Sequence, residues 1–400
     1  MMLKRLACLT AIALGALLGA GSAARANTLV TITIPDRHGE VPAQWLGYAG
    51  PPKADVLLPD GYSAEKRYPL LVLLHGLNQN YGSLVDGGLT AGLAHFDGIV
   101  VMPEGASGWY TDWWNDGARG NPAWESYALD EVIPAILDRY PILPGRRYHA
   151  LAGLSMGGLG AAYLGGRLPG FFGSVASMSG FVDPQLVAPL ASAAMGLLAF
   201  APQNGDTNVN PVYGPPYGFY ADGHNPTRLA ANLEQTRVFE SSGNGVPSDA
   251  GLADPTNGGP YALPEGSAEE RGVILPMSRR WHKALEAAGV DVTYQEHTGG
   301  HDWPDFYNEL AAYLAWGPFK AVDEHASSWV NDTVATSGQL WDIGYRFDTP
   351  PDGVVRFRRS GDTLTISAAG SGVTIRVGDE CSLHVATPAV LPLSRDDCDE

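Results

Sequence analysis

Cysteine and basic side chains are both scarce in this sequence. Only 3 of its 400 residues are cysteine, and 25 lysines and arginines stand against 43 aspartates and glutamates. The formal net charge of -18 argues against the broad basic surface that binding to nucleic acid or to an anionic membrane requires. Because no cluster of cysteine and histidine is present either, we expect no metal site, and nothing in the sequence calls for a cofactor.

The first 26 residues have the pattern of a secretory signal peptide. Lys4 and Arg5 are followed by an apolar run from Leu6 to Gly21, and Ala24-Arg25-Ala26 matches a cleavage site. The run is too short and too rich in alanine and glycine for a membrane anchor. We therefore expect a secreted or cell-envelope protein that begins at Asn27 and has no transmembrane segment after cleavage.

Cleavage would leave two cysteines, Cys381 and Cys398, close to the end of the chain. In an oxidising compartment, a lone pair of this kind predicts one disulfide that closes the tail.

Apolar strands and amphipathic helices alternate between about residues 68 and 314. Residues 68–74 and 98–103 are apolar almost throughout, as expected for strands buried on both faces. Residues 126–140 carry their leucine, isoleucine and valine side chains on one helical face, and a second helix is predicted from Pro276 to Ala288. The alternation predicts a mostly parallel β-sheet flanked by helices. Residues 187–235 lack any period and are predicted as an irregular lid.

The pattern changes after Gly317. Residues 353–358, 362–367 and 373–377 alternate polar and apolar side chains, with glycine-containing turns between them. This is typical of antiparallel β-structure. The predicted organisation is a signal peptide (1–26), a catalytic α/β domain (27–318) and a small β-rich domain (319–400).

The sequence from Gly153 to Gly158 predicts a nucleophile. It contains Gly-x-Ser-x-Gly with Ser155 at its centre, it follows an apolar strand, and it precedes a helix of small residues. A serine hydroxyl needs a base, and His301 follows the last core strand, where the base of such a site is expected. The amide groups of Met156 and Leu77 are the predicted donors of the oxyanion hole.

Several motifs, taken in order, resemble the esterase D and antigen 85 (mycolyltransferase) superfamily of α/β-hydrolases. They are His75-Gly76-Leu77, Tyr110 to Trp114, Trp124-Glu125, Gly153 to Gly158, Ser177 to Phe181, Gly243 to Asp249 and His301 to Pro304. The resemblance covers roughly residues 50–316. It implies the α/β-hydrolase fold and places nucleophile and base at Ser155 and His301.

The acid that the resemblance implies has three candidates. Antigen 85-like proteins have a glutamate just ahead of the helix before the final strand, where this chain has Glu269 and Glu270. The helix register favours Glu270, and counting back from the histidine favours Glu269. Many esterase D-like relatives use an aspartate after the preceding strand, which would be Asp249.

Aromatic residues surround the predicted site. Tyr110, Trp113 and Trp114 form a dense group on one loop, and Trp303 adjoins His301. Such side chains could form the wall of a substrate cleft or could pack beneath the lid.

The resulting hypothesis is an exported serine hydrolase of carboxylic esters that acts through an acyl-serine intermediate on a small-molecule, lipid or glycan ester. One alternative is an acyltransferase that moves the acyl group to a sugar hydroxyl. The resemblance makes this less favoured, because His75 and Asn78 replace the aspartate and arginine of antigen 85 proteins, whose arginine helps to hold trehalose. A second alternative is a non-catalytic binding protein on a hydrolase scaffold. The β-rich domain could contact the cell envelope.

Overall fold

The computed structural model describes residues 27–39, 41, 43, 46–114, 122–186, 212–249, 265–378 and 381–393. The predicted signal peptide, residues 187–211 of the predicted lid, and Cys398 lie outside these ranges.

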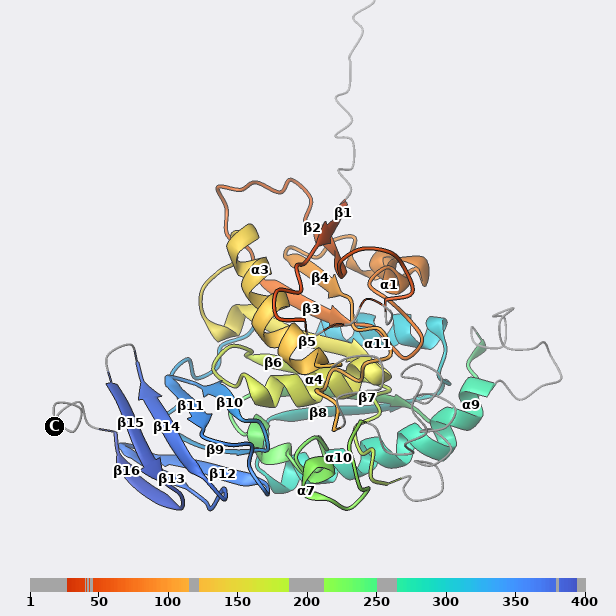
Figure 1. The fold of residues 1–400 in the computed structure, drawn as a ribbon. Helices are drawn as coiled ribbons and strands as arrows, with labels where there is room; N and C mark the ends of the chain where they lie inside the picture. Colours follow the sequence, from red (N-terminus) through yellow and green to blue (C-terminus); the bar gives the residue numbers. More distant parts are fainter. Residues whose placement is uncertain are drawn as a thin grey trace, which may run out of the picture.

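An eight-stranded sheet forms the centre of the molecule (Figure 1). Its order is β1-β2-β4-β3-β5-β6-β7-β8; β1, β2 and β4 pair antiparallel, and every other neighbouring pair is parallel. The predicted mostly parallel sheet is therefore confirmed. The strands are β1 (Thr28–Thr33), β2 (Lys53–Leu58), β3 (Leu70–Leu74), β4 (Ile99–Pro103), β5 (His149–Leu154), β6 (Ser174–Met178), β7 (Arg237–Gly243) and β8 (Val292–His297).

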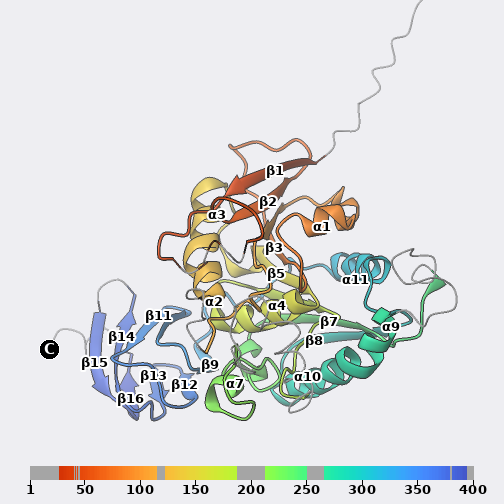
Figure 2. The same ribbon diagram turned by 45° about the vertical axis from the view of Figure 1, so that its right-hand side comes forward.

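Helices cover both faces of this sheet (Figure 2). One face packs against α2 (Trp124–Ser126), η3 (Tyr127–Val132), α3 (Ile133–Arg139), α4 (Met156–Arg167), η8 (Glu270–Ile274) and α10 (Leu275–Ala287). The other face packs against α1 (Ser83–Asp86), η2 (Leu89–Leu93) and α11 (Trp303–Trp316). Alternate residues of a strand enter different cores, since Leu70 and Val72 lie in one cluster while Leu71 and Leu73 lie in the other. Shorter segments are η4 (Arg146–Tyr148), α7 (Phe219–Asp222), η6 (Ala230–Leu233) and α9 (Glu265–Glu269).

The helix before β8 begins earlier than the sequence predicts. We expected it to start at Pro276, but α9, the π-helical turn η8 and α10 follow one another without a break from Glu265. Proline has no N–H to donate to the carbonyl four residues back, and its ring crowds that carbonyl, so a wider π turn accommodates Pro276. Glu269 and Glu270 therefore lie within this helical segment and not ahead of it.

Two antiparallel sheets follow the α/β part, as the alternating pattern predicts. Their orders are β10-β11-β14-β15 and β16-β13-β12-β9, and their apolar faces share one hydrophobic cluster. The strands are β9 (Ser328–Thr333), β10 (Ser337–Leu340), β11 (Ile343–Phe347), β12 (Val355–Ser360), β13 (Thr363–Ile366), β14 (Gly372–Val377), β15 (Cys381–Ala386) and β16 (Ala389–Pro392). Cys381 is disulfide-bonded, and its predicted pairing with Cys398 stays a prediction.

Polar contacts join these sheets to the far end of α4. Arg167, the last residue of α4, donates to the Tyr345 hydroxyl and to the Ser337 carbonyl at 3.0 and 3.2 Å. Asn331 donates to the carbonyl of Gly166 at 2.7 Å. The division at about residue 318 into two domains stays a prediction, and the contacts give the two parts a shared polar boundary.

Candidate active site

Ser155 lies on a sharp turn between β5 and α4, at the carboxyl edge of the parallel strands. Its backbone has φ 55° and ψ -119°, a conformation that few residues with a side chain adopt. A Cβ on Gly153 would collide with the Gly157 backbone, and a Cβ on Gly157 would collide with the Leu74 carbonyl. The turn therefore requires both glycines, as the Gly-x-Ser-x-Gly pattern predicts.

His301 reaches the same edge from the loop between β8 and α11. The Asp302 carboxylate caps α11 by accepting from the Asp305 amide at 3.2 Å, which fixes the helix start directly after the histidine. The His301 amide donates to the Gly266 carbonyl of α9 at 3.0 Å. This backbone contact brings α9 and η8, which carry the candidate acids, beside the imidazole.

The structure brings Ser155, His301 and Glu270 into one hydrogen-bonded chain. Ser155 Oγ lies 2.8 Å from His301 Nε2, and His301 Nδ1 lies 2.8 Å from Glu270 Oε2. A carboxylate only accepts, so in the neutral imidazole Nδ1–H donates to Glu270 and Nε2 is free to accept the Ser155 proton. The chain thus holds the tautomer that a general base needs.

The other two candidate acids do not join this chain. Glu269 and Asp249 are solvent-exposed, whereas Glu270 is completely buried. The negative charge of Glu269 still acts on His301, since it helps to raise the pKa of the imidazole. Of the three carboxylates, Glu270 has the geometry that fits the role of the acid.

The environment of His301 favours its protonated form. Burial alone would lower the pKa of the imidazole, but the hydrogen bond with Glu270 and the nearby charges of Glu269, Glu270 and Glu309 outweigh it and raise the pKa to about 9. A positive charge on this ring is therefore well stabilised. Such a charge arises on the base whenever it takes the proton of a serine.

Two serines contact the second oxygen of Glu270, and no contact between them and the acid is predicted from the sequence. The hydroxyls of Ser179 and Ser242 lie 2.9 and 2.7 Å from Glu270 Oε1. Ser179 follows β6 and has a φ of 43°, and Ser242 lies in β7. Both positions fall at the edge where β5 ends, because parallel strands end together. The carboxylate is thus fixed through both of its oxygens.

A second buried pair, Glu309 and His297, lies behind Ser179. Ser179 Oγ is 2.8 Å from Glu309 Oε1, and His297 Nε2 is 2.8 Å from the same oxygen. A hydroxyl has one proton, so Ser179 cannot donate to Glu270 and Glu309 at once. Burial and the Glu270 charge raise the pKa of Glu309, while the hydrogen bond to Glu309 outweighs burial and raises that of His297 to about 9. His297 is therefore a partner of Glu309.

The predicted oxyanion donors lie on either side of the nucleophile. Met156 is the first residue of α4, so its N–H has no acceptor within the helix, and the helix dipole favours negative charge there. Leu77 lies in the loop after β3, next to Gly76. A Cβ added to Gly76 would lie 3.4 Å from Ser155 Cβ, so this loop runs close to the nucleophile. His75 fixes this loop: its Nε2 accepts from the Gly105 amide at 3.0 Å, so Nδ1–H donates to the Gly76 carbonyl at 2.9 Å.

The predicted aromatic wall divides into buried and accessible members. Tyr110 is 2% exposed, and its hydroxyl donates to the His75 carbonyl, so it supports the loop from within. Trp113 is 4% exposed, whereas Trp114 is 43% exposed and packs against Tyr220. Trp303 is partly buried and lies over Gly87. A role in a substrate cleft stays a prediction for these aromatics.

The described residues contain neither a candidate metal site nor a helix that could span a membrane. Within those ranges, no group of three or more histidine, cysteine, aspartate or glutamate side chains is arranged to hold a metal ion. None of the described helices is both long and apolar enough to cross a membrane.

Comparison with known sequences gives a consistent set of similarities. A family model named Esterase matches residues 48–316. The chain is 28% identical to Esterase Rv1288 of Mycobacterium tuberculosis over an alignment covering 69% of this chain and 59% of that protein. It is 27% identical to the diacylglycerol acyltransferase/mycolyltransferase Ag85C of Mycobacterium avium, with 74% of this chain and 81% of that protein covered. The chain thus spans less than two thirds of the Rv1288 esterase.

Comparison with solved structures identifies the fold of the same region. MPT51 of Mycobacterium tuberculosis superposes with a TM-score of 0.54 at 22% identity, covering 73% of this chain and 99% of that chain. An S-formylglutathione hydrolase from Agrobacterium tumefaciens gives a TM-score of 0.51 at 14% identity, covering 74% and 96%. At these identities the likeness concerns the fold alone, and it agrees with the α/β-hydrolase architecture. The sheets β9 to β16 begin beyond the family match.

Proposed function

The chain belongs to the Esterase family, and from this premise we propose that it is an exported serine esterase acting through an acyl-serine intermediate. The single observation that carries the proposal is the chain of two 2.8 Å contacts from Ser155 through His301 to Glu270. The support is chemical, because each atom has the donor or acceptor role that acyl transfer needs.

The first half of the reaction forms the acyl-enzyme. Ser155 Oγ attacks the ester carbonyl carbon while its proton passes to His301 Nε2, and Glu270 stabilises the resulting imidazolium. The carbonyl oxygen becomes an oxyanion, which the amides of Met156 and Leu77 stabilise. The carbon–oxygen bond to the alcohol then breaks, and the alcohol leaves with the proton from His301.

The second half regenerates the serine. A water molecule gives a proton to His301 Nε2 and attacks the acyl carbon, and the carboxylic acid leaves as Ser155 takes the proton back. If a sugar hydroxyl replaces water, the same steps give a transferase. We favour hydrolysis because Asn78, which accepts from the Ser107 hydroxyl at 3.3 Å, stands where the resemblance places the sugar-holding arginine and carries no positive charge.

Hydrolysis and transfer are distinguished by turnover of a p-nitrophenyl ester with and without trehalose. We expect the free acid as the product in both cases and no turnover by Ser155→Ala. Complete partition into an acylated sugar would replace hydrolysis by transfer. An inactive wild-type protein across a panel of short and long acyl esters would favour the non-catalytic binding alternative.

The remaining parts of the proposal concern the cellular location of the protein and its division into domains. The pattern of residues 1–26 supports export, with the mature enzyme secreted or at the cell envelope. The separate hydrophobic cluster of β9 to β16, and the end of the family match at residue 316, support a catalytic domain of residues 27–318 and a β-rich domain of 319–400. The substrate class that fits is a small-molecule, lipid or glycan ester.

A further inference from the structure

A cavity of about 1030 Å³ lies between the α/β part and the sheet β10-β11-β14-β15. We call it the seam pocket. Ser155, His301 and Glu270 do not line it, and Arg167, which does, ends the helix that Ser155 precedes. The helix has 12 residues, which places the pocket about 18 Å along its axis from the nucleophile. Half of its wall comes from residues beyond the family match, so the pocket is not the family's active site.

One wall is the polar face of a β-sheet. Cross-strand pairing sets Ser337 opposite Arg346 and Arg346 opposite Thr374, and likewise sets Gly344 between Gln339 and Arg376. Alternate residues share a face, so these six side-chain positions all line the same surface, while Tyr345 and Ile375 enter the hydrophobic cluster. Gly344 has no side chain, and a Cβ added there would lie 3.1 Å from Gln339 Oε1 and 3.6 Å from Arg376 Cβ.

The two arginines on this wall are available to a ligand. Arg346 and Arg376 are exposed, and neither forms an ion pair with any residue in the described ranges. They occupy diagonal positions on neighbouring strands, about 7–8 Å apart. Two guanidinium groups at that spacing can converge on one carboxylate. In a chain with a net charge of -18, such a pair is an uncommon local excess of positive charge.

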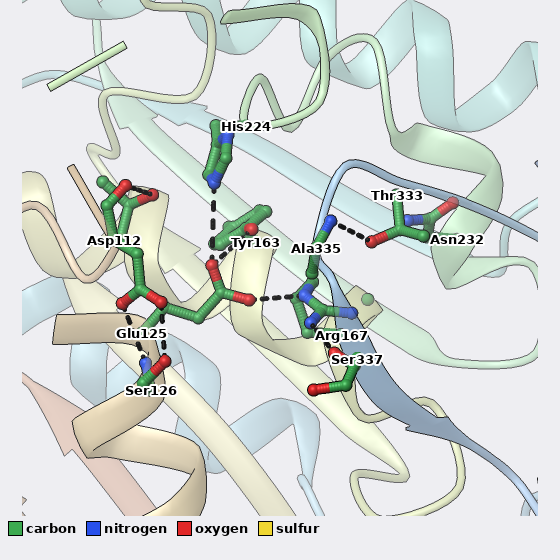
Figure 3. Close-up of polar contacts among 12 residues, drawn as sticks. Asp112, Glu125, Ser126, Tyr163, Arg167, His224, Asn232, Thr333, Ala335 and Ser337 are labelled. Atoms are coloured by element: carbon green, nitrogen blue, oxygen red, sulfur yellow. Dashed lines mark hydrogen bonds and ion pairs between the residues drawn. The ribbon is translucent and has the colours of Figure 1, made fainter. Parts of the chain in front are cut away.

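Glu125, Arg167 and His224 form the floor of the seam pocket, and the charges of Glu125 and Arg167 are already paired with each other (Figure 3). Glu125 accepts from Arg167 Nε and, at 2.6 Å, from the Tyr163 hydroxyl, and His224 approaches it at 3.6 Å. Burial would raise the pKa of Glu125, but the Arg167 charge outweighs it and lowers the pKa to about 2. A floor built this way presents polar atoms in fixed positions and leaves no net charge for a ligand to neutralise.

Two carboxylates and two aromatic residues of the α/β part also line the pocket. Asp112 accepts from the amide and hydroxyl of Ser126 at 3.0 and 2.6 Å, and Asp130 is exposed. The aromatic residues are Tyr220 and Trp113. Carboxylates facing the pocket disfavour a ligand with many negative charges, and they accept hydrogen bonds from hydroxyl groups. Ring faces pack against apolar C–H surfaces.

We propose that the seam pocket binds an oligosaccharide that carries a carboxylate, with the acidic sugar against Arg346 and Arg376. Neighbouring neutral sugars lie toward Asp130, an exposed carboxylate of the α/β part. The donors Arg346 and Arg376 and the acceptors Asp112 and Asp130 in one pocket match hydroxyl groups, which both donate and accept. This binding site is separate from the ester chemistry and does not depend on it.

The test uses the full-length chain carrying Ser155→Ala, so that binding is measured without turnover. Calorimetry with a disaccharide of one glucuronic acid and one neutral hexose should give a saturable 1:1 isotherm. The double variant Arg346→Gln/Arg376→Gln should weaken binding by about tenfold or more, since two charge-assisted contacts are lost. Gly344→Leu should also weaken it, because a side chain there would crowd Gln339 and Arg376. The matched control is Arg358→Gln, an exposed arginine of β12 outside the pocket, and it should bind as the parent does.

Any of four outcomes would overturn the proposal. The first three are the absence of binding to the disaccharide in folded protein, equal binding by the double arginine variant, and equal binding of the carboxyl-reduced disaccharide. Equal affinity for free acetate would also overturn it, because the site would then hold a carboxylate and not a saccharide. Thermal melting of each variant shows that it is folded, and p-nitrophenyl ester turnover by the same substitutions in the Ser155 background reports separately on the proposed catalysis.

Discussion

The two ends of α4 carry two different buried carboxylate clusters. At the N-terminal end, Glu270 is paired with an imidazole, which exchanges a proton near neutral pH. At the C-terminal end, Glu125 is paired with the Arg167 guanidinium, which keeps its proton. Both carboxylates are buried and fully hydrogen-bonded. The difference shows that the partner, and not burial, separates a cluster suited to chemistry from one suited to holding two parts of the chain together.

Removing the nucleophile should have the largest effect. Ser155→Ala deletes the attacking oxygen, so we expect kcat for ester hydrolysis to fall by about 10⁴-fold or more. Steady-state assays of ester hydrolysis, with an enzyme-free blank, measure the loss. The matched control is Ser360→Ala, an exposed serine at the end of β12, which should keep activity within about twofold. A variant with wild-type turnover would remove Ser155 from the mechanism.

Neutralising Glu270 should come next. Glu270→Gln keeps the shape of the side chain but permits the wrong imidazole tautomer and removes the charge that stabilises imidazolium, so kcat should fall by about 10³- to 10⁴-fold. Glu269→Gln is the matched control, because its side chain is exposed and its charge helps to raise the pKa of His301, whereas the hydrogen bond that holds the tautomer comes from Glu270. Equal losses in the two variants would contradict the choice between the candidate acids.

Breaking the pair at the other end of α4 should affect stability more than turnover. Arg167→Met leaves Glu125 buried without its cation, and we expect a loss of about 3–5 kcal/mol in the free energy of unfolding. Denaturant titration measures it, with Arg139→Met at an exposed position of α3 as control, expected within about 0.5 kcal/mol. At denaturant concentrations below the unfolding transition, kcat of Arg167→Met should stay within a few-fold of the wild-type value. A large loss of kcat in folded protein would show that this end of α4 also serves the chemistry.

The pH dependence of kcat/KM should report on the cluster at the N-terminal end of α4, which contains His301. The base must be neutral to accept a proton, and the pKa of His301 is raised to about 9. kcat/KM should therefore rise with pH, roughly tenfold per unit, and level off near that value. A rising limb centred below the ordinary histidine pKa of about 6.5 would contradict the stabilised imidazolium.

The smallest effect is expected from a change in the Glu309–His297 pair, which lies behind Ser179. Glu309→Gln removes one of the negative charges that raise the pKa of His301, so the rising limb should move to lower pH while the plateau changes only a few-fold. Glu286→Gln on the exposed face of α10 is the control. A purely structural role for Glu309 would change the melting temperature and leave the limb in place.

The sequence predicts some of these features better than others. The parallel sheet and the turn at Ser155 follow from apolar runs and from glycine positions, which are local signals. The acid could not be chosen among three carboxylates, because the choice depends on a π turn before Pro276 that the periodicity conceals. The contacts of Ser179 and Glu309 and the seam pocket depend on distant segments, and no local pattern predicts them. Whether Tyr110 forms a cleft wall or packs inside the protein stays open at the level of sequence, because composition alone does not reveal burial.

The central claim is that the Ser155 oxygen is activated by His301. Mass spectrometry of the folded protein treated with a fluorophosphonate tests it most directly. We expect one adduct per chain, on the peptide that contains Ser155, and its loss in His301→Gln. An adduct on another residue, or none on protein shown to be folded, would contradict the account.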